Sequence, residues 1–264
     1  CYKKVCKSCT FYNRSTFFVV YFITSTLSYR LCITYSLLSY TLCLRLTPLI
    51  LKSETMHKIT LNVPEGIRYL SDWHDLWDTL LPEGQHYILN KRICGCGATE
   101  AYLRSGRKVI LASPRKHLLY NKYSQHLSDN LHLYRYQGDK KRYFENTDNT
   151  GKDILAFNDE LGRYIQSGGR KILTTYDSLG KIVEVLVSSG ECLQEWIVVV
   201  DEFQSIFCDC QYKATTEYEF SMILGMFSTV VYLSATPFLE SYLEMTGQFG
   251  GLTVYELLLS LIHI

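Results

Sequence analysis

The chain has 264 residues, of which 47% are hydrophobic and 20% are charged, and its formal net charge is +1. This length supports one large domain, or one domain with a tail. The first 55 residues hold seven Lys or Arg and one acid, which leaves 20 basic and 25 acidic residues in the remainder. A basic field over the whole molecule is therefore excluded as the basis of nucleic-acid binding, which would need a local groove.

Residues 1–55 differ from the rest, because they are dense in Tyr, Ser, Thr, Leu and Cys. A membrane span is disfavoured, since Arg30 and Arg45 interrupt the apolar runs before the roughly 18 residues that a span requires. A signal peptide is disfavoured because no clear small-residue cleavage site follows. We expect this segment to be translated upstream sequence outside the natural protein, which then begins at Met56.

Histidine and cysteine patterns exclude several enzyme classes. No HExxH, triad-like or GxSxG pattern indicates a zinc protease or a serine hydrolase. Cys6 and Cys9 have the spacing of a metal site, but no second pair follows at a suitable distance. Reduced thiols in a cytoplasmic protein are the expected state.

A glycine-rich turn connects a predicted strand, residues 87–91, to a predicted helix, residues 98–105. The turn consists of Gly95, Cys96, Gly97, Ala98 and Thr99. Glycines allow close backbone approach and a helix start offers free N–H groups to an anion, so this turn can cradle phosphates. Ala98 and Arg92 replace the lysine and the first glycine of the usual G-x-x-x-x-G-K-[ST] pattern, and Lys91 or Arg92 could supply the missing charge. The alternative is an ordinary turn.

Strands and helices are expected to alternate along the rest of the chain. Further strands are predicted at 108–112, 131–135, 171–174, 196–200 and 229–233, and helices at 116–127, 153–167, 176–187, 215–226 and 237–246. This order predicts an α/β fold with a mainly parallel sheet and helices on both faces. Residues 137–152 are polar and charged, and we interpret them as an exposed, solvated loop that is not a binding patch.

The strand at 196–200 is apolar and β-branched, and it ends in Asp201 and Glu202. Such a run is typical of a buried parallel strand, and open α/β sheets bind ligands at the carboxyl ends of their strands. Adjacent carboxylates at that end are costly unless they hold a cation or activate water. The alternative is a strand that runs into a solvated acidic turn.

The strand at 229–233 ends in Ser234, Ala235 and Thr236, and Pro237 can start the next helix. Small hydroxyl residues at the end of a strand are often turn formers or helix caps. Their position after a strand that ends in two acids favours a more specific role.

The order of these three motifs resembles that of superfamily two helicases of the DEAD/DEAH-like group. The resemblance covers residues 56–252 and implies the first RecA-like domain of that family, a P-loop NTPase three-layer sandwich. The NK-x-x-x-GxGAT loop is similar to that of a divergent branch known from phages and mobile elements, in which GAT stands in place of GKT. The missing lysine leaves open whether the site hydrolyses ATP.

The resemblance implies ATP and Mg²⁺ as cofactors. The residues implied to bind ATP are Lys91, Gly95, Cys96, Gly97, Ala98 and Thr99. Thr99 and Asp201 are implied to hold Mg²⁺, while Asp201 and Glu202 are the expected catalytic residues, with Glu202 activating the attacking water. The residues implied to couple the nucleotide site to domain movement are Gln204, Ser234 and Thr236.

Residues after two further strands are implied to contact the backbone of single-stranded or duplex nucleic acid. They are Ser113, Pro114, Arg115, Thr174 and Thr175. Hydroxyls and an arginine can bind phosphates without reading bases. Ser113 and Thr175 could instead be ordinary helix caps.

The last residues, 253–264, end in the uncharged run LLLSLIHI and are expected to be a truncation or artefact tail after the domain at 56–252. A full helicase needs a second RecA-like domain, so a helicase fragment from the cytoplasm of a bacterial host or phage-infected cell is expected, with no membrane partner. The alternative is a non-hydrolysing nucleic-acid-binding or scaffold module, which Ala98 motivates.

Overall fold

The computed structural model describes residues 57–76, 81–126, 130–145, 151–208, 219–235 and 252–258, all within the unit Thr55–Ile264. The expectations for residues 1–55, for the helix at 237–246 and for Thr236 lie outside these described residues. The described strands are β1 (His57–Asn62), β2 (His86–Asn90), β3 (Lys108–Ser113), β4 (Leu131–Leu133), β5 (Lys171–Thr175), β6 (Trp196–Asp201), β7 (Thr229–Ser234) and β8 (Thr253–Leu258).

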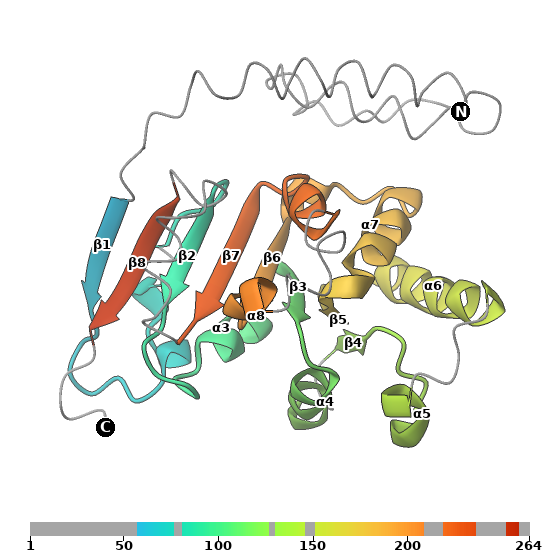
Figure 1. The fold of residues 1–264 in the computed structure, drawn as a ribbon, viewed down its shortest axis with the longest axis horizontal. Helices are drawn as coiled ribbons and strands as arrows, with labels where there is room; N and C mark the ends of the chain where they lie inside the picture. Colours follow the sequence, from blue (N-terminus) through green and yellow to red (C-terminus); the bar gives the residue numbers. More distant parts are fainter. Residues whose placement is uncertain are drawn as a thin grey trace, which may run out of the picture. The chain divides into compact units, whose positions relative to one another are not determined.

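These eight described strands form one sheet with the order β1-β8-β2-β7-β6-β3-β5-β4 (Figure 1). Every pairing among them is parallel, so their carboxyl ends share one edge of the sheet. The central strands are apolar along their whole length, as the burial of Trp196, Val198 and Val199 on β6 shows. The predicted α/β fold with a parallel sheet is confirmed.

Helices cover both faces of this sheet. The helical elements are η3 (Leu70–Asp72), α3 (Ala98–Arg104), α4 (Lys116–Gln125), α5 (Lys140–Glu145), α6 (Gly151–Gln166), η5 (Tyr176–Ser178), α7 (Leu179–Ser188), η6 (Leu193–Glu195) and α8 (Gln204–Cys208). Residues of α6 and α7 belong to one apolar core, and residues of α3, α4 and α5 belong to a second. Adjacent strand residues such as Ile110 and Leu111 fall in different cores because successive side chains point to opposite faces. The architecture is therefore a three-layer sandwich.

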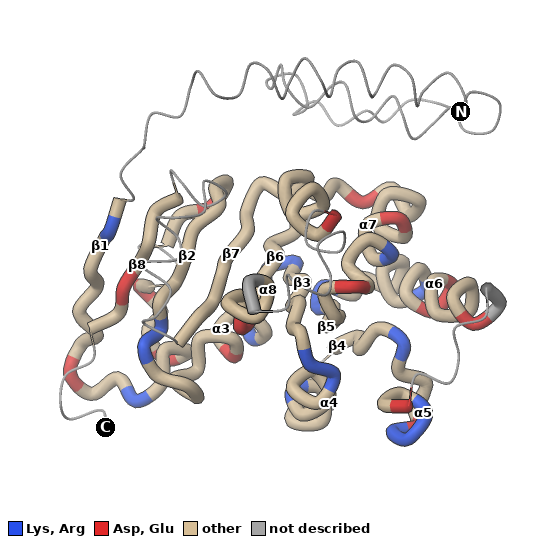
Figure 2. The backbone as a smooth tube through the Cα atoms, in the orientation of Figure 1, with Lys and Arg blue, Asp and Glu red and all other residues tan. Residues whose placement is uncertain are grey.

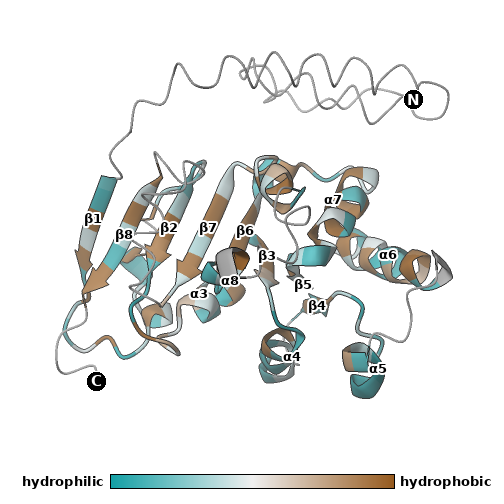
Figure 3. Cartoon of the chain, in the orientation of Figure 1, coloured by the Kyte–Doolittle hydropathy of each residue, from teal (hydrophilic) through white to brown (hydrophobic). Residues whose placement is uncertain are grey.

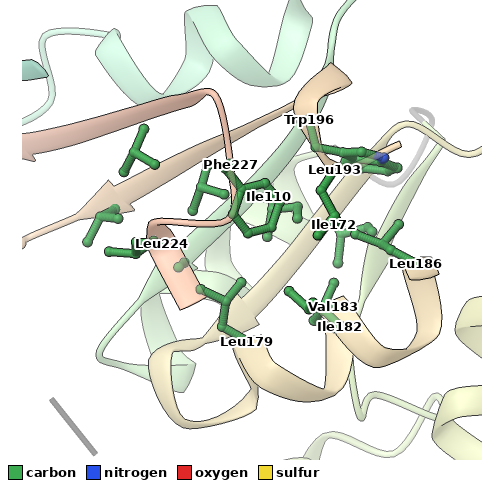
Figure 4. Close-up of a cluster of buried hydrophobic side chains, with 14 of the residues drawn as sticks. Ile110, Ile172, Leu179, Ile182, Val183, Leu186, Leu193, Trp196, Leu224 and Phe227 are labelled. Atoms are coloured by element: carbon green, nitrogen blue, oxygen red, sulfur yellow. The ribbon is translucent and has the colours of Figure 1, made fainter. Parts of the chain in front are cut away.

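The core against α6 and α7 is drawn in Figure 4, where Leu179, Ile182 and Leu186 pack against Ile110 and Ile172 of the sheet. All five side chains are fully buried. Burial of each such side chain is worth about 1.5–3 kcal/mol by transfer from water. Figure 3 shows that the central strands are largely hydrophobic, in keeping with their burial.

Two strands and one helix differ from the sequence prediction. β1 and β8 were not predicted, and β8 continues the sheet past the predicted domain boundary at Leu252. Residues 137–152 were interpreted as a solvated loop, but they contain α5, whose Tyr143 is buried in the second core. Tyr143 contacts the rings of Phe144 and Tyr136, so aromatic packing holds this charged segment against the domain.

Candidate functional site

The glycine-rich turn, the acid pair and the hydroxyl motif meet at the carboxyl edge of the sheet. β7 lies between β2 and β6, and its register pairs Asn90 with Ser234 and Asp201 with Leu233. Just beyond the strand ends, the Lys91 N–H donates to the Ser234 carbonyl over 2.8 Å, and the Phe203 N–H donates to the Leu233 carbonyl over 3.2 Å. The end of β7 therefore ties the turn after β2 to the acids after β6.

Lys91 brings a positive charge to the acid pair. Its Nζ lies 3.1 Å from Asp201 Oδ1 and 3.6 Å from Glu202 Oε1. The lysine is only 6% exposed. Burial lowers the pKa of Lys91, but the charge of Asp201 and then that of Glu202 outweigh it, so the pKa of Lys91 is raised. The ammonium remains charged at neutral pH and can bind an anion at this edge.

The backbone of the turn after β2 has a fixed and unusual shape. Arg92, Gly95 and Gly97 have φ values of 59°, 75° and 88°. The Leu70 N–H donates to the Cys96 carbonyl over 2.7 Å, which fastens the turn to η3. A Cβ added at Gly97 would lie 3.1 Å from Tyr69 Cβ, so only glycine fits the close approach.

The turn runs directly into α3. Gly97 is the N-cap, Ala98 and Thr99 form the first turn, and both side chains are buried. N–H groups of a first helical turn have no partner within the helix, so they can bind an anion. Burial raises the pKa of the Cys96 thiol, and this outweighs the opposite effects of the Ala98 N–H and the Lys91 charge. The thiol is therefore neutral, and the Lys91 charge lies close enough to affect it.

The acid pair is held by a network of its own. Glu202 has a φ of 56°, which is rare for a residue with a Cβ. Strained backbone conformations of this kind cluster at functional sites. Gln204 Nε2 donates to Glu202 Oε2, and Ser205 Oγ donates to the Glu202 carbonyl over 2.8 Å. Gln204 Oε1 is buried without a hydrogen-bond partner among the described residues. One buried polar atom beside the acid pair thus has no partner among the described residues.

The predicted nucleic-acid residues lie further along the same edge. Ser113 and Thr175 are paired in register at the ends of β3 and β5. Ser113 and Thr174 are each 1% exposed, and Ser113 Oγ has no hydrogen-bond partner among the described residues. Pro114 is half-buried and Arg115 is exposed. The structure therefore places this group together, with Arg115 as its exposed cation and with Ser113 and Thr174 inside the sheet.

Tyr176 has a contact that the sequence analysis did not predict. Its Oη donates to the Asp201 carbonyl over 2.5 Å, although β3 separates β5 from β6. Its ring lies against Phe220, with 4.7 Å between the centroids. Burial raises the pKa of Tyr176 well above its usual value, so the hydroxyl remains a donor. Tyr176 joins the predicted nucleic-acid loop to the acid pair, and no local sequence signal reveals a contact across a strand.

The sequence analysis also did not predict a role for Glu256. It lies on β8, is 3% exposed, and pairs with Lys58 and Arg92. Arg92 stands where the usual phosphate loop has its first glycine, and Glu256 holds it away from the acid pair. The turn thus directs Lys91 to Asp201 and Arg92 to Glu256, so Lys91 is the cation positioned next to the acid pair.

Among known proteins, similarity to this chain is found in solved structures. No protein-family model matches the chain, and no curated protein matches it. Among solved structures, the chain is similar to a hypothetical ATP-dependent RNA helicase from Sulfolobus tokodaii, with 14% sequence identity and a TM-score of 0.37. The similarity covers 66% of this chain and 48% of that structure, so this chain spans about half of its length.

Among the described residues, no group of three or more His, Cys, Asp or Glu side chains could hold a metal ion. Within the same residues, no helix combines the length and apolar character needed to cross a membrane.

Proposed function

We propose that the described unit is the ATP-binding domain of a nucleic-acid-dependent ATPase of the helicase type, related to the divergent branch with a GxGAT loop. The observation that carries the proposal is the approach of Lys91 to Asp201 and Glu202 beside a glycine turn. The turn with φ values above zero at Gly95 and Gly97 offers N–H groups, and Lys91 supplies the cation that Ala98 lacks.

The residues present fit a nucleotide with Mg²⁺. Asp201, Glu202 and Thr99 offer hard oxygen ligands, and Mg²⁺ usually takes one or two carboxylates together with substrate phosphates. Bound Mg²⁺ would neutralise phosphate charge. Thr99 and Asp201 hold it in this proposal, and the N–H groups of residues 95–99 bind the phosphates.

Glu202 and Gln204 are suited to position water. Glu202 is held in a left-handed backbone conformation, and Gln204 Nε2 fixes one of its carboxylate oxygens. The other oxygen, Oε1, faces Lys91 at 3.6 Å. Glu202 orients the attacking water and accepts its proton, and Gln204 and Ser234 connect this site to the neighbouring elements, as does Thr236 in the proposal.

Nucleic acid is the proposed partner, through Ser113, Pro114, Arg115, Thr174 and Thr175 and without base readout. The contact of Tyr176 Oη with the Asp201 carbonyl provides a direct connection from this loop to the acid pair. A second RecA-like domain is the other proposed partner, since closure between two domains would complete the ATP site.

One observation favours a second function, that of a binding module which does not hydrolyse ATP. Ala98 removes the lysine of the usual loop, and Lys91 is held at Asp201 by an ion pair. If this pair persisted when a nucleotide entered, the acids could not act on a metal or on water.

ATP hydrolysis by a two-domain form of the protein, compared with its Glu202→Gln variant, separates the two functions. Loss of a general base lowers the rate by about 10²–10⁴-fold. We expect such a loss in Glu202→Gln, with ATP affinity retained. If both forms hydrolyse ATP equally slowly, with and without DNA or RNA, the ATPase proposal is wrong and the binding module remains.

A further inference from the structure

A tyrosine outside the proposed binding and catalytic residues contacts the backbone of the acid pair. Tyr176 begins η5, directly after Thr175 at the end of β5. Its Oη donates to the Asp201 carbonyl over 2.5 Å. β3 lies between β5 and β6 (Figure 2), so the tyrosine side chain crosses a strand to make this contact. The contact is therefore made by the side chain and not by the hydrogen-bond ladder of the sheet.

The ring of Tyr176 is held by apolar packing. It lies against buried Phe220, with an interplanar angle of 39°, at the margin of the core that α6 and α7 cover. A tyrosine side chain has only two torsions, so a packed ring fixes where its hydroxyl lies. Burial raises the pKa of Tyr176, although a hydrogen bond with the Ser205 side chain acts in the opposite direction. The hydroxyl therefore keeps the proton that it donates.

The accepting carbonyl belongs to the peptide unit that precedes Glu202. The Asp201 carbonyl and the Glu202 amide lie in one plane, because the peptide bond is rigid. The φ of Glu202 describes rotation of this plane about the bond from the amide nitrogen to Cα. A hydrogen bond to the Asp201 carbonyl therefore resists that rotation and helps to hold the φ of 56°. A left-handed conformation is unfavourable for a residue with a Cβ, so it needs such support.

The other contacts of Glu202 come from α8 and from Lys91. The Ser205 N–H and Oγ donate to the Glu202 carbonyl over 3.0 and 2.8 Å, which fixes the peptide that follows Glu202. Gln204 Nε2 holds one carboxylate oxygen, and the other lies 3.6 Å from Lys91 Nζ. Tyr176 holds the peptide that precedes Glu202, and it does so from a distant segment. The direction of the Glu202 side chain thus depends on a residue of the loop after β5.

A ligand on the loop after β5 would act on the backbone from which Tyr176 extends. Thr175 is half-buried, and its Oγ1 donates to Ser178 Oγ over 3.2 Å, which closes the short turn η5 around Tyr176. A phosphate oxygen that accepted this hydroxyl would take it from Ser178. Occupation of Thr175 and the position of the Tyr176 ring are therefore coupled within a single turn of the chain.

We propose that Tyr176 is a positioning residue for Glu202, and that through it the geometry of Glu202 responds to a nucleic-acid backbone at Thr174 and Thr175. The inference rests on the proposed function, in which Glu202 orients the attacking water. A phosphate bound at Thr175 fixes the turn that carries Tyr176 and so steadies the contact with the Asp201 carbonyl. Binding of the strand then favours the conformation of Glu202 that activates water.

Hydrogen–deuterium exchange of the full chain, followed by mass spectrometry, tests the positioning role. Tyr176→Phe removes the hydroxyl and keeps the ring. Tyr164→Phe is the matched control, because Tyr164 Oη accepts the Lys171 N–H over 2.9 Å at the opposite end of β5 and donates to the Asn130 carbonyl over 2.7 Å. We expect the amides of residues 201–206 to exchange about fivefold faster in Tyr176→Phe, the effect of losing one hydrogen bond, and to be unchanged in Tyr164→Phe.

Two outcomes of this exchange measurement would overturn the proposal. Exchange of residues 201–206 at the parent rate in Tyr176→Phe would show that the hydroxyl does not hold the peptide before Glu202. Faster exchange spread over the whole domain would show that Tyr176 serves general stability.

The same measurement with a saturating single-stranded oligonucleotide, oligothymidylate or oligouridylate, tests the response to nucleic acid. We expect residues 201–206 of the parent protein to exchange more slowly when the oligonucleotide is bound. This slowing should be lost in Tyr176→Phe, although the variant binds the oligonucleotide with the parent affinity. Equal slowing in both proteins would show that the coupling does not pass through Tyr176, and no slowing in the parent protein would overturn the response to nucleic acid.

ATP hydrolysis by the two-domain form shows whether Tyr176 acts through Glu202. A small misplacement of a catalytic group costs up to about 10²-fold in rate, so we expect Tyr176→Phe to lower kcat by about tenfold or more with KM for ATP unchanged. In a Glu202→Gln background, Tyr176→Phe should cause no further loss, because residues that act as a unit are not additive. A full additional loss in that background would contradict a positioning role.

The two kinds of measurement separate this inference from the function on which it rests. If the parent protein does not hydrolyse ATP but the exchange results hold, the ATPase proposal fails and the control of the Glu202 backbone by Tyr176 remains. If the parent protein hydrolyses ATP and Tyr176→Phe has the kcat of Tyr164→Phe, only the inference about Tyr176 fails.

Discussion

Lys91 lies directly after β2 and reaches the carboxylates of Asp201 and Glu202 at the end of β6, a strand that is not adjacent to β2. We expect Lys91→Ala to weaken ATP affinity by about tenfold or more, the effect of losing a charge-assisted hydrogen bond to a phosphate. Arg104→Ala is the control, because Arg104 is exposed and its ion pair is with Glu100 of the same helix. Calorimetric titration with ATP measures both. Equal effects would show that Lys91 is not the loop cation.

His132 gives the protein a sensitivity to acid. Its ring is buried against Tyr164, its Nε2 has no hydrogen-bond partner among the described residues, and burial lowers its pKa to about 4. The unfolded chain binds this proton below a pH of about 6.5, so the stability that neutral His132 provides is present above that pH and is lost as the pH falls toward 4.

His132→Phe should remove this pH dependence. The difference in unfolding free energy between variant and parent should favour the variant increasingly from pH 6.5 to pH 4, by roughly 3 kcal/mol at most. Urea denaturation at several pH values measures it. A constant difference across this range would mean that His132 is solvated in the folded state.

Residues that belong to local patterns could be identified from the sequence, and residues with distant partners could not. Asp201, Glu202 and the glycine turn were identifiable because a strand that ends in charge and a Gly-x-Gly turn are local patterns. The Lys91 contacts bring the residue directly after β2 to Asp201 and Glu202, while the roles of the turn and of the acids in catalysis and binding stay predictions. Tyr176 and Glu256 were not identifiable, since their partners come from distant segments.

At the scale of an element, the start of α3 depends on Gly97. Gly97→Ala would place a Cβ 3.1 Å from Tyr69 Cβ at a φ of 88°, so both contact and conformation oppose it. We expect a loss of about 1–2 kcal/mol or more in unfolding free energy, together with weaker ATP binding. Gly106→Ala is the control, because a Cβ there meets nothing within 4 Å. Similar losses in the two variants would contradict the tight fit.

The sequence predicted the strands whose residues are apolar along their length. It did not predict elements that contain charged residues held in place by distant partners. Residues 196–200 and 229–233 are uniformly apolar, and both are strands. β8 has Glu256 within an apolar run, and its charge is tolerated because Lys58 and Arg92 pair with it. α5 is mostly charged and is held by Tyr143, which is a tertiary effect.

At the scale of the whole molecule, the sheet depends on β8. This strand pairs with β1 on one side and with β2 on the other. A chain that ends at Leu252 would therefore leave β1 without its described partner and would expose one side of β2. We expect such a chain to unfold at a lower temperature or to aggregate, whereas one that ends at Leu258 should melt like the full chain. Equal melting of the two shortened chains would show that β8 is dispensable.

The overall topology could be predicted only in part. Alternating strands and helices indicate a parallel sheet with two covered faces, because parallel connections need crossovers. The strand order could not be predicted in this way, since β3 lies three positions away from β2 in the sheet. The two strands between them, β7 and β6, come later in the chain. No pattern within residues 86–113 records that gap, and only long-range packing produces it.

The position of β1 at the end of the described sheet, beside β8, has a consequence for biosynthesis. β1 is the first described strand to leave the ribosome, and its described partner β8 is the last. Until residue 258 emerges, the nascent chain carries β1 unpaired and β2 open along one side. β1 and β2 can therefore complete their pairing only at the end of translation of this unit. They form the part of the chain that a chaperone would meet first.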